Sequence, residues 1–501
     1  MTRLLTVMSF VLGAVPVVAD EALLRQSWWP QFRGPNGGGV AAQAKELPVS
    51  FGPSKNVVWK TRLPHGHSSP CVWKNRIFLT GFAAQQKRLE TLCIDRPTGK
   101  ILWRRAAPAE KIETVHEISS PATPTPATDG QRVFVYFGSY GLLCYDFDGR
   151  EQWKRPLPIP NLYFGTGASP IVAGPFVLLN IDQQGDSHLF AVDRATGETA
   201  WKKERLSFQR GWSTPVHVRH DGIDQVVVLG GRRLVAYDLK DGRERWWVDG
   251  MPPFPITTPV VGQDRLYLAV SDEYGEPDNV VQPPAFEDFA KRHDKNKDGK
   301  IAREEIPPEF IVIDRRASQG AGDVTLRGWF FRSVDRDKDG ALNRREWDKF
   351  AKRMAEWPTQ FHQQVLAVRL GGRGDVTKTH IAWQDGKGVP EVPSPLYYQD
   401  RIYTVKNGGI VFCRDATTGK VVFRGRLGAI GGYYASPVAG DGKVYAASDR
   451  GVIIVFRAGD RFEVLARNDF GEPIMATPAI VNRQLYVRTE RFLYAFGDGL
   501  P

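Results

Sequence analysis

The chain has 501 residues, which by length alone allows two to four domains. Its 42% hydrophobic and 25% charged residues are typical of a globular protein, whereas its 50 Gly and 35 Pro exceed what a helical protein contains. With 14 Trp as well, the composition argues against a mainly helical fold and favours many short strands joined by turns.

The first 19 residues are predicted to form a signal peptide. Arg3 supplies the charged start, residues 4–18 are apolar, and Val17, Val18 and Ala19 form a small-residue cleavage site. The apolar run is short for a bilayer span, so we expect cleavage near Ala19 and no membrane span in the mature chain. The protein is then exported, to the periplasm or outside the cell. An uncleaved N-terminal anchor is the alternative.

The formal net charge of +11 bears on the choice of partner. In an exported protein this charge argues against nucleic acid and favours anionic lipid, polysaccharide or an acidic protein surface. A solvated basic surface without a specific partner explains the charge equally well. We expect an envelope protein or a glycan as the partner.

One sequence unit recurs eight times. Each copy begins with Ser-Pro or Thr-Pro, and a strand such as "RIFLTG", "RVFVYFG" or "RLYLAV" follows. Most successive prolines are 41 to 45 residues apart, a period typical of four-stranded propeller blades. The prolines are Pro70, Pro126, Pro170, Pro215, Pro259, Pro395, Pro437 and Pro478.

A turn of fixed spacing follows the third strand of several units. It has Asp, then Gly, then an aromatic residue, each four positions on, as in Asp193, Gly197 and Trp201. Asp accepts backbone N–H groups in such a turn and Gly supplies a positive φ, while the aromatic side chain is predicted to pack against the neighbouring blade. Other copies are Asp95, Gly99, Trp103; Asp238, Gly242, Trp246; and Asp415, Gly419, Phe423. In the copy Asp146, Gly149, Trp153 the first step is one residue shorter.

The two ends of the chain complement each other. The last pattern, "FLYAFG", is a third strand without a fourth, and "NVVWKT" around Trp59 is a fourth strand without a third. We therefore predict an all-β, eight-bladed β-propeller that its N-terminal strand closes, which removes the exposed sheet edge. The predicted divisions are a signal peptide (1–19), a first propeller part (20–275), an inserted α-helical lobe in blade 5 (276–362) and a second propeller part (363–501).

The repeats resemble a known family. "CIDRPTGKILW", "AVDRATGETAW" and "CRDATTGKVVF" are similar to the PQQ-like β-propeller repeat, which quinoprotein dehydrogenases share with the BamB-type outer-membrane assembly factor. "WWPQFRGPNGGGVA" resembles the N-terminal stretch of many exported propellers of this type. The resemblance implies the fold but not one function, because one fold hosts many functions.

The cysteines bear on whether the chain is an enzyme, a possibility that the resemblance to quinoprotein dehydrogenases raises. The quinoprotein dehydrogenases imply a PQQ cofactor and an adjacent pair of cysteines, but no two of the four cysteines here are neighbours. Three of them stand two residues before an Asp, where other repeats have Ala191 or Ala236, so they are predicted to be small buried residues and not disulfides. PQQ is a possible cofactor without specific residues behind it, and no catalytic residue is assigned. The cysteines are Cys71, Cys93, Cys144 and Cys413.

The step from Pro259 to Pro395 spans 136 residues and contains two loops with the pattern of an EF-hand. In such a loop calcium takes side-chain oxygens at positions 1, 3 and 5, a backbone carbonyl at 7 and a bidentate Glu at 12, with Gly at 6. The predicted ligands are Asp294, Asn296, Asp298, Lys300 and Glu305 in the first loop, and Asp335, Asp337, Asp339, Ala341 and Glu346 in the second.

The flanks of these loops support a paired helical unit. Ile301 at position 8 suits a short β-bridge between the two hands, and Pro307 is predicted to shorten the helix that leaves the first loop. Nearby Lys and Arg residues predict weak sites, with dissociation constants on the order of 0.1 to 1 mM. We expect a structural calcium role; a calcium switch and a metal-free degenerate hand are the alternatives. Apolar residues at helical spacing are Phe286, Phe289, Trp347, Phe350, Met354 and Trp357.

The segments that lead into the eight blades are expected to meet near the axis on one face of the ring. They carry aromatic, basic and acidic side chains, which is how the mouth of a ligand funnel would look. Side chains that only pack the channel mouth are the alternative. The predicted funnel residues are His67, His116, Glu117, Tyr163, Arg210, Trp212 and Tyr433, with His65, Phe254, Glu391 and Tyr434 nearby.

Three functions fit these observations. The first is an exported binding or scaffold propeller with a calcium-binding lobe, in the manner of envelope assembly factors. The second is a quinone-dependent oxidoreductase, and the third is a carbohydrate-binding propeller that uses the aromatic funnel. The sequence favours the first, and enzyme activity is not the expected outcome.

Overall fold

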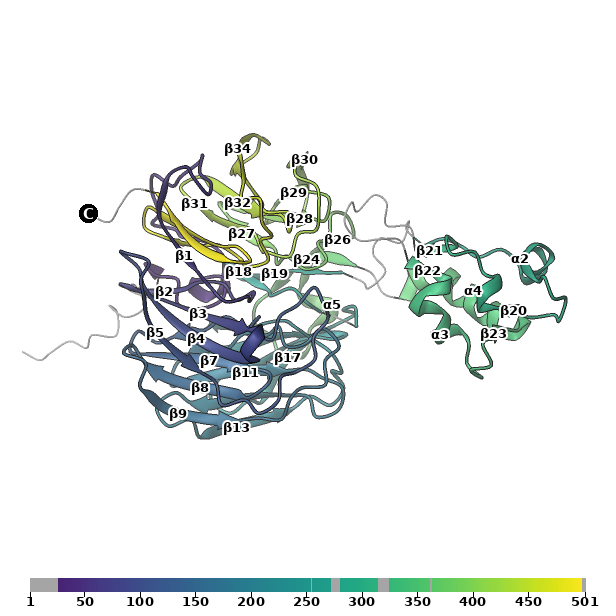
Figure 1. Ribbon diagram of the computed structural model, residues 1–501, viewed down its shortest axis with the longest axis horizontal. Coiled ribbons are helices and arrows are strands. Elements are labelled where there is room, and N and C mark those ends of the chain that lie inside the picture. Colours follow the sequence, from purple (N-terminus) through teal and green to yellow (C-terminus); the bar gives the residue numbers. More distant parts are fainter. Residues whose placement is uncertain (1–25, 254, 272–279, 314–323, 361–362, 498–501) are drawn as a thin grey trace, which may run out of the picture.

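The computed structural model describes residues 26–253, 255–271, 280–313, 324–360 and 363–497. The predicted signal peptide and Phe254 lie outside these residues. Within them, the strands form eight sheets arranged as the blades of a ring, so the predicted eight-bladed propeller is confirmed (Figure 1). A smaller helical lobe lies beside the ring.

The first four blades take the strands in chain order from the axis outward. They are β2 (Cys71–Trp73), β3 (Arg76–Ala83), β4 (Arg88–Asp95) and β5 (Ile101–Ala106); β6 (Ala127–Thr128), β7 (Arg132–Phe137), β8 (Gly141–Asp146) and β9 (Glu151–Pro156); β10 (Ile171–Ala173), β11 (Phe176–Ile181), β12 (His188–Asp193) and β13 (Thr199–Glu204); β14 (Val216–His220), β15 (Ile223–Gly230), β16 (Arg233–Asp238) and β17 (Glu244–Asp249).

The remaining blades follow the same order with two exceptions, at the insertion and at the chain ends. They are β18 (Val260–Gly262), β19 (Arg265–Val270), β24 (Gln364–Arg369) and β26 (Ile381–Asp385); β27 (Leu396–Tyr398), β28 (Arg401–Lys406), β29 (Ile410–Asp415) and β30 (Val421–Arg426); β31 (Val438–Gly440), β32 (Lys443–Ala447), β33 (Val452–Arg457) and β34 (Val464–Asp469); β35 (Ala479–Val481), β36 (Gln484–Arg488), β37 (Phe492–Phe496) and β1 (Val57–Arg62).

Burial changes from the inner to the outer strands of a blade. The middle strands β7 and β8 are buried along almost their whole length, which fits their continuous apolar sequence. The outer strands β9 and β13 bury the Trp at their centre, while most of their other residues are exposed or half-buried. Blades 2 and 3 therefore present a polar outer edge and bury the Trp of that edge strand.

The Ser-Pro and Thr-Pro pairs form a closed ring of hydrogen bonds around the axis. The backbone N–H of each Ser or Thr donates to the hydroxyl of the corresponding residue in the next blade, at 2.9 to 3.3 Å. The bond from Thr477 to Ser69 joins residues 408 positions apart and closes the circle. The members are Ser69, Thr125, Ser169, Thr214, Thr258, Ser394, Ser436 and Thr477.

The Asp–Gly–aromatic turns join neighbouring blades, as predicted. The indole of Trp153 donates to the carbonyl of Arg194 in the next blade at 3.1 Å and lies under Gly197. Gly197 has φ 75°, and a Cβ there would come within 2.6 Å of the indole, so only glycine fits. Trp59, Trp103, Trp201 and Trp383 dock in the same way under Gly99, Gly149, Gly242 and Gly419.

Trp246 is an exception to this docking. Its indole donates to Gln225 of its own blade at 2.9 Å and is fully buried. Blade 5 instead contributes a short parallel strand, β25 (Gly374–Asp375), which pairs with β17, and the helical turn α5 (Thr377–His380) follows it. The sequence did not predict this fifth strand.

The chain ends close the ring as predicted. β1 pairs antiparallel with β37, with Trp59 opposite Ala495, so the N-terminal strand completes the eighth blade. The residues before it run across the ring: Trp29 pairs with Val72 in blade 1, the short turn η1 (Pro35–Gly37) contacts β14, and Val40 pairs with Ala439 in blade 7. This N-terminal arm therefore contacts blades 1, 4 and 7 before the chain reaches β1.

The insertion leaves blade 5 between β19 and β24, as predicted, and forms the lobe. Its elements are α2 (Phe286–His293), β20 (Ile301–Ala302), η4 (Arg303–Glu305), β21 (Ile311–Ile313), β22 (Val324–Thr325), η5 (Leu326–Phe330), α3 (Phe331–Val334), β23 (Ala341–Leu342) and α4 (Arg344–Gln360). A further short turn, η2 (Ala84–Gln86), lies in blade 1.

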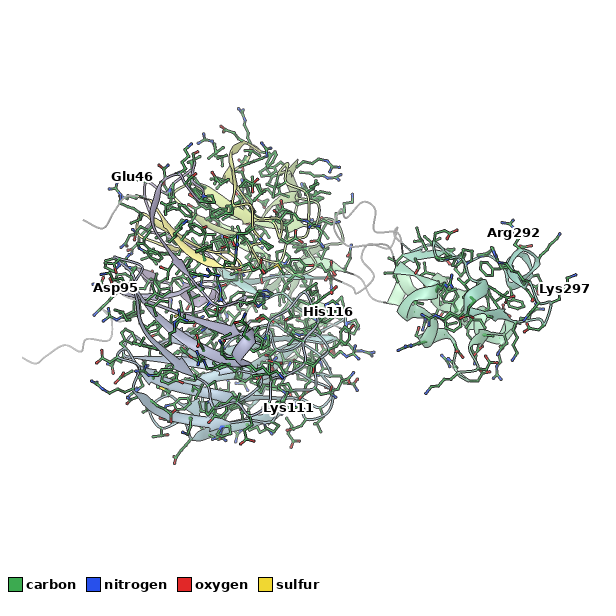
Figure 2. The ribbon with its side chains drawn as sticks, in the orientation of Figure 1. Glu46, Asp95, Lys111, His116, Arg292 and Lys297 are labelled. Atoms are coloured by element: carbon green, nitrogen blue, oxygen red, sulfur yellow. The ribbon has the colours of Figure 1, made fainter. Side chains whose placement is uncertain are left out.

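The direction of the strands fixes the face on which the lobe begins. Successive strands of a blade are antiparallel, so the connection between the second and third strands lies on the same face as the segment that leads into the next blade. The lobe therefore begins on the face of the lead-in segments. His116, in one of these segments, lies on the part of the ring nearer the lobe (Figure 2).

Candidate functional site

The two acidic loops of the lobe have the same hydrogen-bond framework. At position 12, Glu305 accepts from the N–H of Lys295 at 2.8 Å and of Ala302 at 2.8 Å. In the second loop Glu346 accepts from Arg336 at 2.8 Å and from Asn343 at 3.1 Å. Both Glu side chains therefore fold back over their own loop.

The Asp at position 1 is held in the same way in each loop. Asp294 accepts from the N–H of Gly299 at 3.0 Å, and Asp335 accepts from Gly340 at 3.1 Å. The two glycines have φ of 78° and 87°, which supplies the sharp turn at position 6. The other carboxylate oxygen of Asp294 and of Asp335 is buried and has no hydrogen-bond partner among the described residues.

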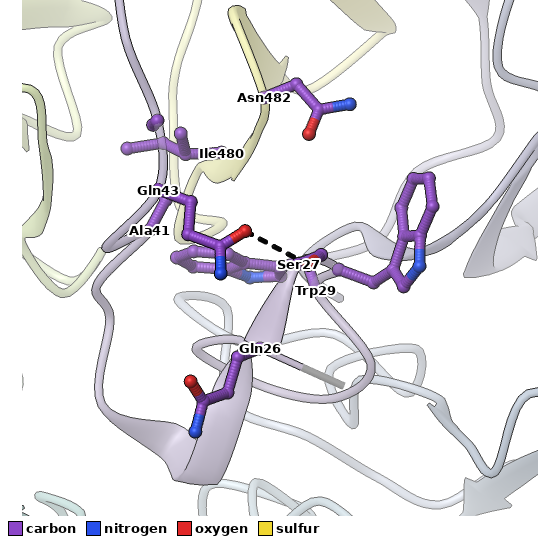
Figure 3. A pocket seen from close by; sticks show the side chains of 9 residues that line it. Gln26, Ser27, Trp29, Ala41, Gln43, Ile480 and Asn482 are labelled. Atoms are coloured by element: carbon purple, nitrogen blue, oxygen red, sulfur yellow. Dashed lines mark hydrogen bonds between the residues drawn. The ribbon is translucent and has the colours of Figure 1, made fainter. Parts of the chain in front are cut away.

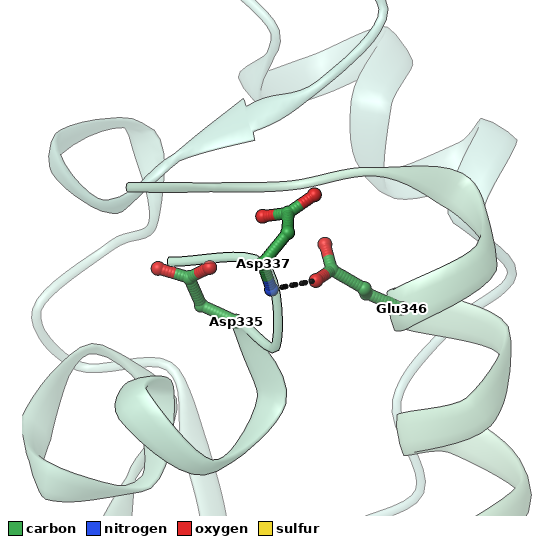
Figure 4. A group of neighbouring side chains, drawn as sticks. All are labelled: Asp335, Asp337 and Glu346. Carbon is green, nitrogen blue, oxygen red and sulfur yellow. Dashed lines mark hydrogen bonds between the residues drawn. The ribbon is translucent and has the colours of Figure 1, made fainter. Parts of the chain in front are cut away.

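In the second loop three carboxylates converge. One oxygen from each of Asp335, Asp337 and Glu346 lies within 4.8 Å of the others (Figure 4). Asp335 is 8% exposed and Glu346 is 6% exposed, so two of the three carboxylates are buried. Like charges held this close repel one another unless a cation lies between them, and oxygen ligands are those that calcium prefers.

The two loops contact each other. Ile301 pairs with Leu342 in the two-stranded sheet of β20 and β23. Lys300 donates from its ammonium group to Asp339, position 5 of the other loop, at 2.6 Å. This contact holds the pKa of Asp339 below its usual range and raises that of Lys300.

The lobe has its own small aromatic core. Trp347 is fully buried, its ring centroid lies 4.4 Å from that of Phe289, and its indole donates to the carbonyl of Pro284 at 2.9 Å. Phe286, Phe350 and Met354 belong to the same cluster, while the side chain of Trp357 lies outside the described residues. After the first loop the chain makes only the three-residue turn η4 before Pro307. Arg292 and Lys297 lie at the far end of the lobe (Figure 2).

Of the predicted funnel residues, the structure brings His116, Tyr163 and Trp212 into one cluster. Phe164, which the sequence did not single out, lies between them, with its ring centroid 5.1 Å from His116 and 5.7 Å from Trp212. Glu117 is exposed beside His116. A run of aromatic residues in adjacent lead-in segments was the available signal for this cluster.

His67 and Tyr433 lie elsewhere. The ring of His67 is 5.1 Å from that of His65, and burial, with further contributions from His65 and Arg488, lowers the pKa of His67 to about 3. Tyr433 is 1% exposed and donates from its hydroxyl to the carbonyl of Ala429 at 3.0 Å, so it belongs to a hydrophobic core. His67 is therefore neutral, and Tyr433 is closed to a ligand.

A small pocket lies away from the lead-in segments, between the N-terminal arm and blade 8 (Figure 3). Ser27 donates to the amide oxygen of Gln43 at 3.2 Å across it. Its lining residues are Gln26, Ser27, Trp28, Trp29, Ala41, Gln43, Ala44, Ile480 and Asn482. Only neutral side chains line it, so it offers no group for acid–base chemistry.

Two buried arginines of the ring bear on whether an anionic quinone could bind. Arg205 pairs with Asp182 at 2.8 and 2.9 Å, and Arg488 donates to the carbonyls of Ser68 and Thr80 at 3.1 and 2.8 Å. These two guanidinium groups are therefore committed within the protein. The four cysteines are free and buried. Cys71 and Cys93 lie in blade 1, while Cys144 and Cys413 lie in blades 2 and 6.

The repeat is similar to that of known proteins. A family model described as outer membrane protein assembly factor BamB matches residues 49–184 and 185–282. The outer membrane protein assembly factor BamB of Alkalilimnicola ehrlichii is 26% identical over 202 residues, which are 40% of this chain and 43% of that relative. These matches support a PQQ-like propeller. In particular, they support the BamB-type repeat.

Solved structures share the fold at low identity. BamB from Moraxella catarrhalis has a TM-score of 0.51 at 12% identity and covers 88% of this chain and 97% of its own. Quinohemoprotein alcohol dehydrogenase from Comamonas testosteroni has a TM-score of 0.53 at 12% identity, with 95% and 81% covered. A europium-containing methanol dehydrogenase has a TM-score of 0.53 at 10% identity, with 96% and 100% covered. At these identities the likeness concerns the fold alone.

The length and hydropathy of the helices decide whether any of them could cross a bilayer. Across the part of the chain that the structure describes, no helix combines the length and the apolar character that a membrane crossing requires.

Proposed function

We propose that this chain is an exported, calcium-stabilised PQQ-like propeller that acts as a binding or scaffold protein of the cell envelope. The similarity to BamB supports the envelope and scaffold parts of this proposal. The lobe, taken as residues 276–362, is proposed to be a pair of EF-hands that calcium folds and stiffens. The signal peptide at residues 1–19 delivers the chain to its compartment.

One observation carries the calcium assignment. Both loops direct a buried carboxylate oxygen, from Asp294 and from Asp335, away from every protein donor that the structure describes. An unpaired buried charge is costly, so a cation at each loop accounts for this arrangement. The side chains at positions 1, 3, 5 and 12 and the carbonyl oxygens of Lys300 and Ala341 at position 7 are the proposed ligands.

The experiment is a calorimetric titration of the mature, chelator-treated protein with calcium. We expect two sites with dissociation constants on the order of 0.1 to 1 mM. Glu346→Gln removes the bidentate ligand of the second loop and should weaken that site roughly tenfold or more. Asp348→Asn is the matched control, because that carboxylate is 59% exposed and lies outside the loop positions. Equal calcium binding by wild type and Glu346→Gln would refute the assignment of the second loop.

The alternative function, a quinone-dependent oxidoreductase, is tested by a second titration in the same calorimeter. The similarity of the fold to that of two dehydrogenases is the reason to test this alternative. Adding pyrroloquinoline quinone to the calcium-loaded protein should release no heat and should not change the absorbance of the quinone. Saturable quinone binding would place the oxidoreductase ahead of the scaffold.

A further inference from the structure

The lead-in segments of blades 2, 3 and 4 carry a continuous row of aromatic rings. The ring of His116 lies 5.5 Å from that of Tyr163, which lies 5.0 Å from Phe164, and Phe164 lies 5.7 Å from Trp212. We call these four residues the aromatic shelf. Tyr163 is 70% exposed and Phe164 is 38% exposed, and the other two are half-buried. Large apolar faces exposed side by side mark a contact surface.

The shelf is held in place from below. Trp212 donates from its indole to the carbonyl of Gly165 at 2.9 Å. Thr166 donates to the buried carboxylate of Glu113 twice, from its N–H at 3.1 Å and from its hydroxyl at 2.8 Å. Gly165 has φ 77°, and a Cβ there would lie 2.4 Å from Val115. Rings fixed in this way lose little conformational entropy when a ligand binds.

Hydrogen-bonding groups, among them two exposed amides, border the shelf. The N–H of Asn161 donates to the amide oxygen of Gln183 at 2.8 Å, and the N–H of Gln184 donates to the carbonyl of Asn161 at 3.3 Å. These bonds bring Gln184 beside the segment that carries Tyr163. Asn161 and Gln184 are both exposed, and when the amide of Gln184 is turned so that its oxygen faces Arg210, that oxygen accepts from Nε of Arg210 at 3.1 Å.

We propose that the aromatic shelf binds a neutral oligosaccharide. A pyranose ring has an apolar C–H face and a rim of hydroxyl groups, and it can stack on Tyr163 while its hydroxyls bond to the amides of Asn161 and Gln184. Successive shelf rings are tilted by 51 to 83°, so they form steps, and each step can contact a different sugar of the chain. This binding is additional to the calcium sites and does not depend on them.

The test uses the full mature protein, saturated with calcium, and two soluble probes: the tetramer of N-acetylglucosamine and cellotetraose. Binding is measured by calorimetry and by saturation-transfer NMR. We expect at least one probe to bind, Tyr163→Ala to weaken it about tenfold, and Tyr163→Phe to keep most of the affinity, since the stacking face remains. Leu206→Ala is the control, because Leu206 is 60% exposed but lies outside the shelf.

Either of two binding results would overturn the proposal. One is that neither probe binds the wild type; the other is that Tyr163→Ala, with an unchanged melting temperature, binds as well as the wild type. If instead the wild type self-associates and Tyr163→Ala lowers its sedimentation coefficient, the shelf is a protein interface and the glycan assignment falls. Calcium titration of the same variants keeps this test separate from that of the lobe.

Discussion

The ring and the lobe are stabilised in different ways. In the ring, each blade buries continuous apolar strands, and neighbouring blades exchange a hydroxyl bond at the axis and an indole bond at the rim. In the lobe, a single aromatic cluster lies beside two acidic loops, and three carboxylates of the second loop converge. Under the proposed calcium assignment, the lobe combines a small core with unpaired charge and depends on a partner ion more than the closed ring does.

The ring depends on the fit of its glycines more than on charge. Gly197→Ala should place a methyl group against Trp153 and force a left-handed conformation on a residue with a side chain, at a cost of roughly 2 to 4 kcal/mol. Gly222→Ala is the control, because Gly222 has φ 75° but nothing within 4 Å of the added Cβ. Urea denaturation should show a large loss for the first variant and a small one for the second. Equal losses would mean that the indole contact adds nothing.

When calcium is removed, the lobe should unfold while the ring stays folded. At calcium concentrations about 100 times the dissociation constant, binding stabilises a folded unit by about 2.7 kcal/mol. Calorimetric melting with chelator should therefore show a low-temperature transition for the lobe that calcium moves upward, while the ring transition stays in place. A single transition that shifts as a whole would contradict the separation of the two regions.

The ring should instead respond to pH through Glu113. Burial raises the pKa of this carboxyl to about 7, above the ordinary value of 4.5. The folded state therefore holds the proton more tightly, so stability is highest below about pH 4.5 and falls by roughly 1 to 3 kcal/mol as the pH rises through 7. Glu113→Gln should lose this slope. We would measure urea midpoints of both proteins from pH 4.5 to 8; parallel curves would exclude the effect.

The smallest expected effect concerns the contact between the loops. Lys300 holds Asp339, so calcium at the second loop competes with an ammonium group, and Lys300→Ala should raise the affinity of that site by roughly two- to fivefold. Lys297→Ala is the control, since it removes a neighbouring exposed charge from the first loop. The gain should shrink at high salt, because exposed ion pairs are screened. Calcium titrations at two salt concentrations measure it.

Periodic features of the fold were predictable from the sequence. The proline period gave the blade count, and the unmatched strand patterns at the two ends gave the closure between β1 and β37. The insertion point after β19 followed from the one long step between repeats. These features could be predicted because each leaves a pattern within a short stretch of the sequence.

Contacts between residues that are far apart in the sequence could not be predicted from it. The hydroxyl ring joins residues of different blades, so the Ser-Pro pairs marked each repeat without revealing their partners. Tyr433 was expected at the funnel, but Gly428 and Gly431 have positive φ and the chain around them turns back, which places that ring in the core. Phe164 was overlooked because the row of rings appears only when three blades stand side by side.

Hydrogen exchange measured by mass spectrometry, with and without calcium, tests most directly whether the lobe depends on calcium and the ring does not. Peptides from α2 and α4 should exchange rapidly in chelator and become protected when calcium is added. Peptides from β7, β8, β36 and β37 should exchange slowly in both conditions. Lobe peptides that are equally protected without calcium would contradict the account, because the two loops would then fold without a cation.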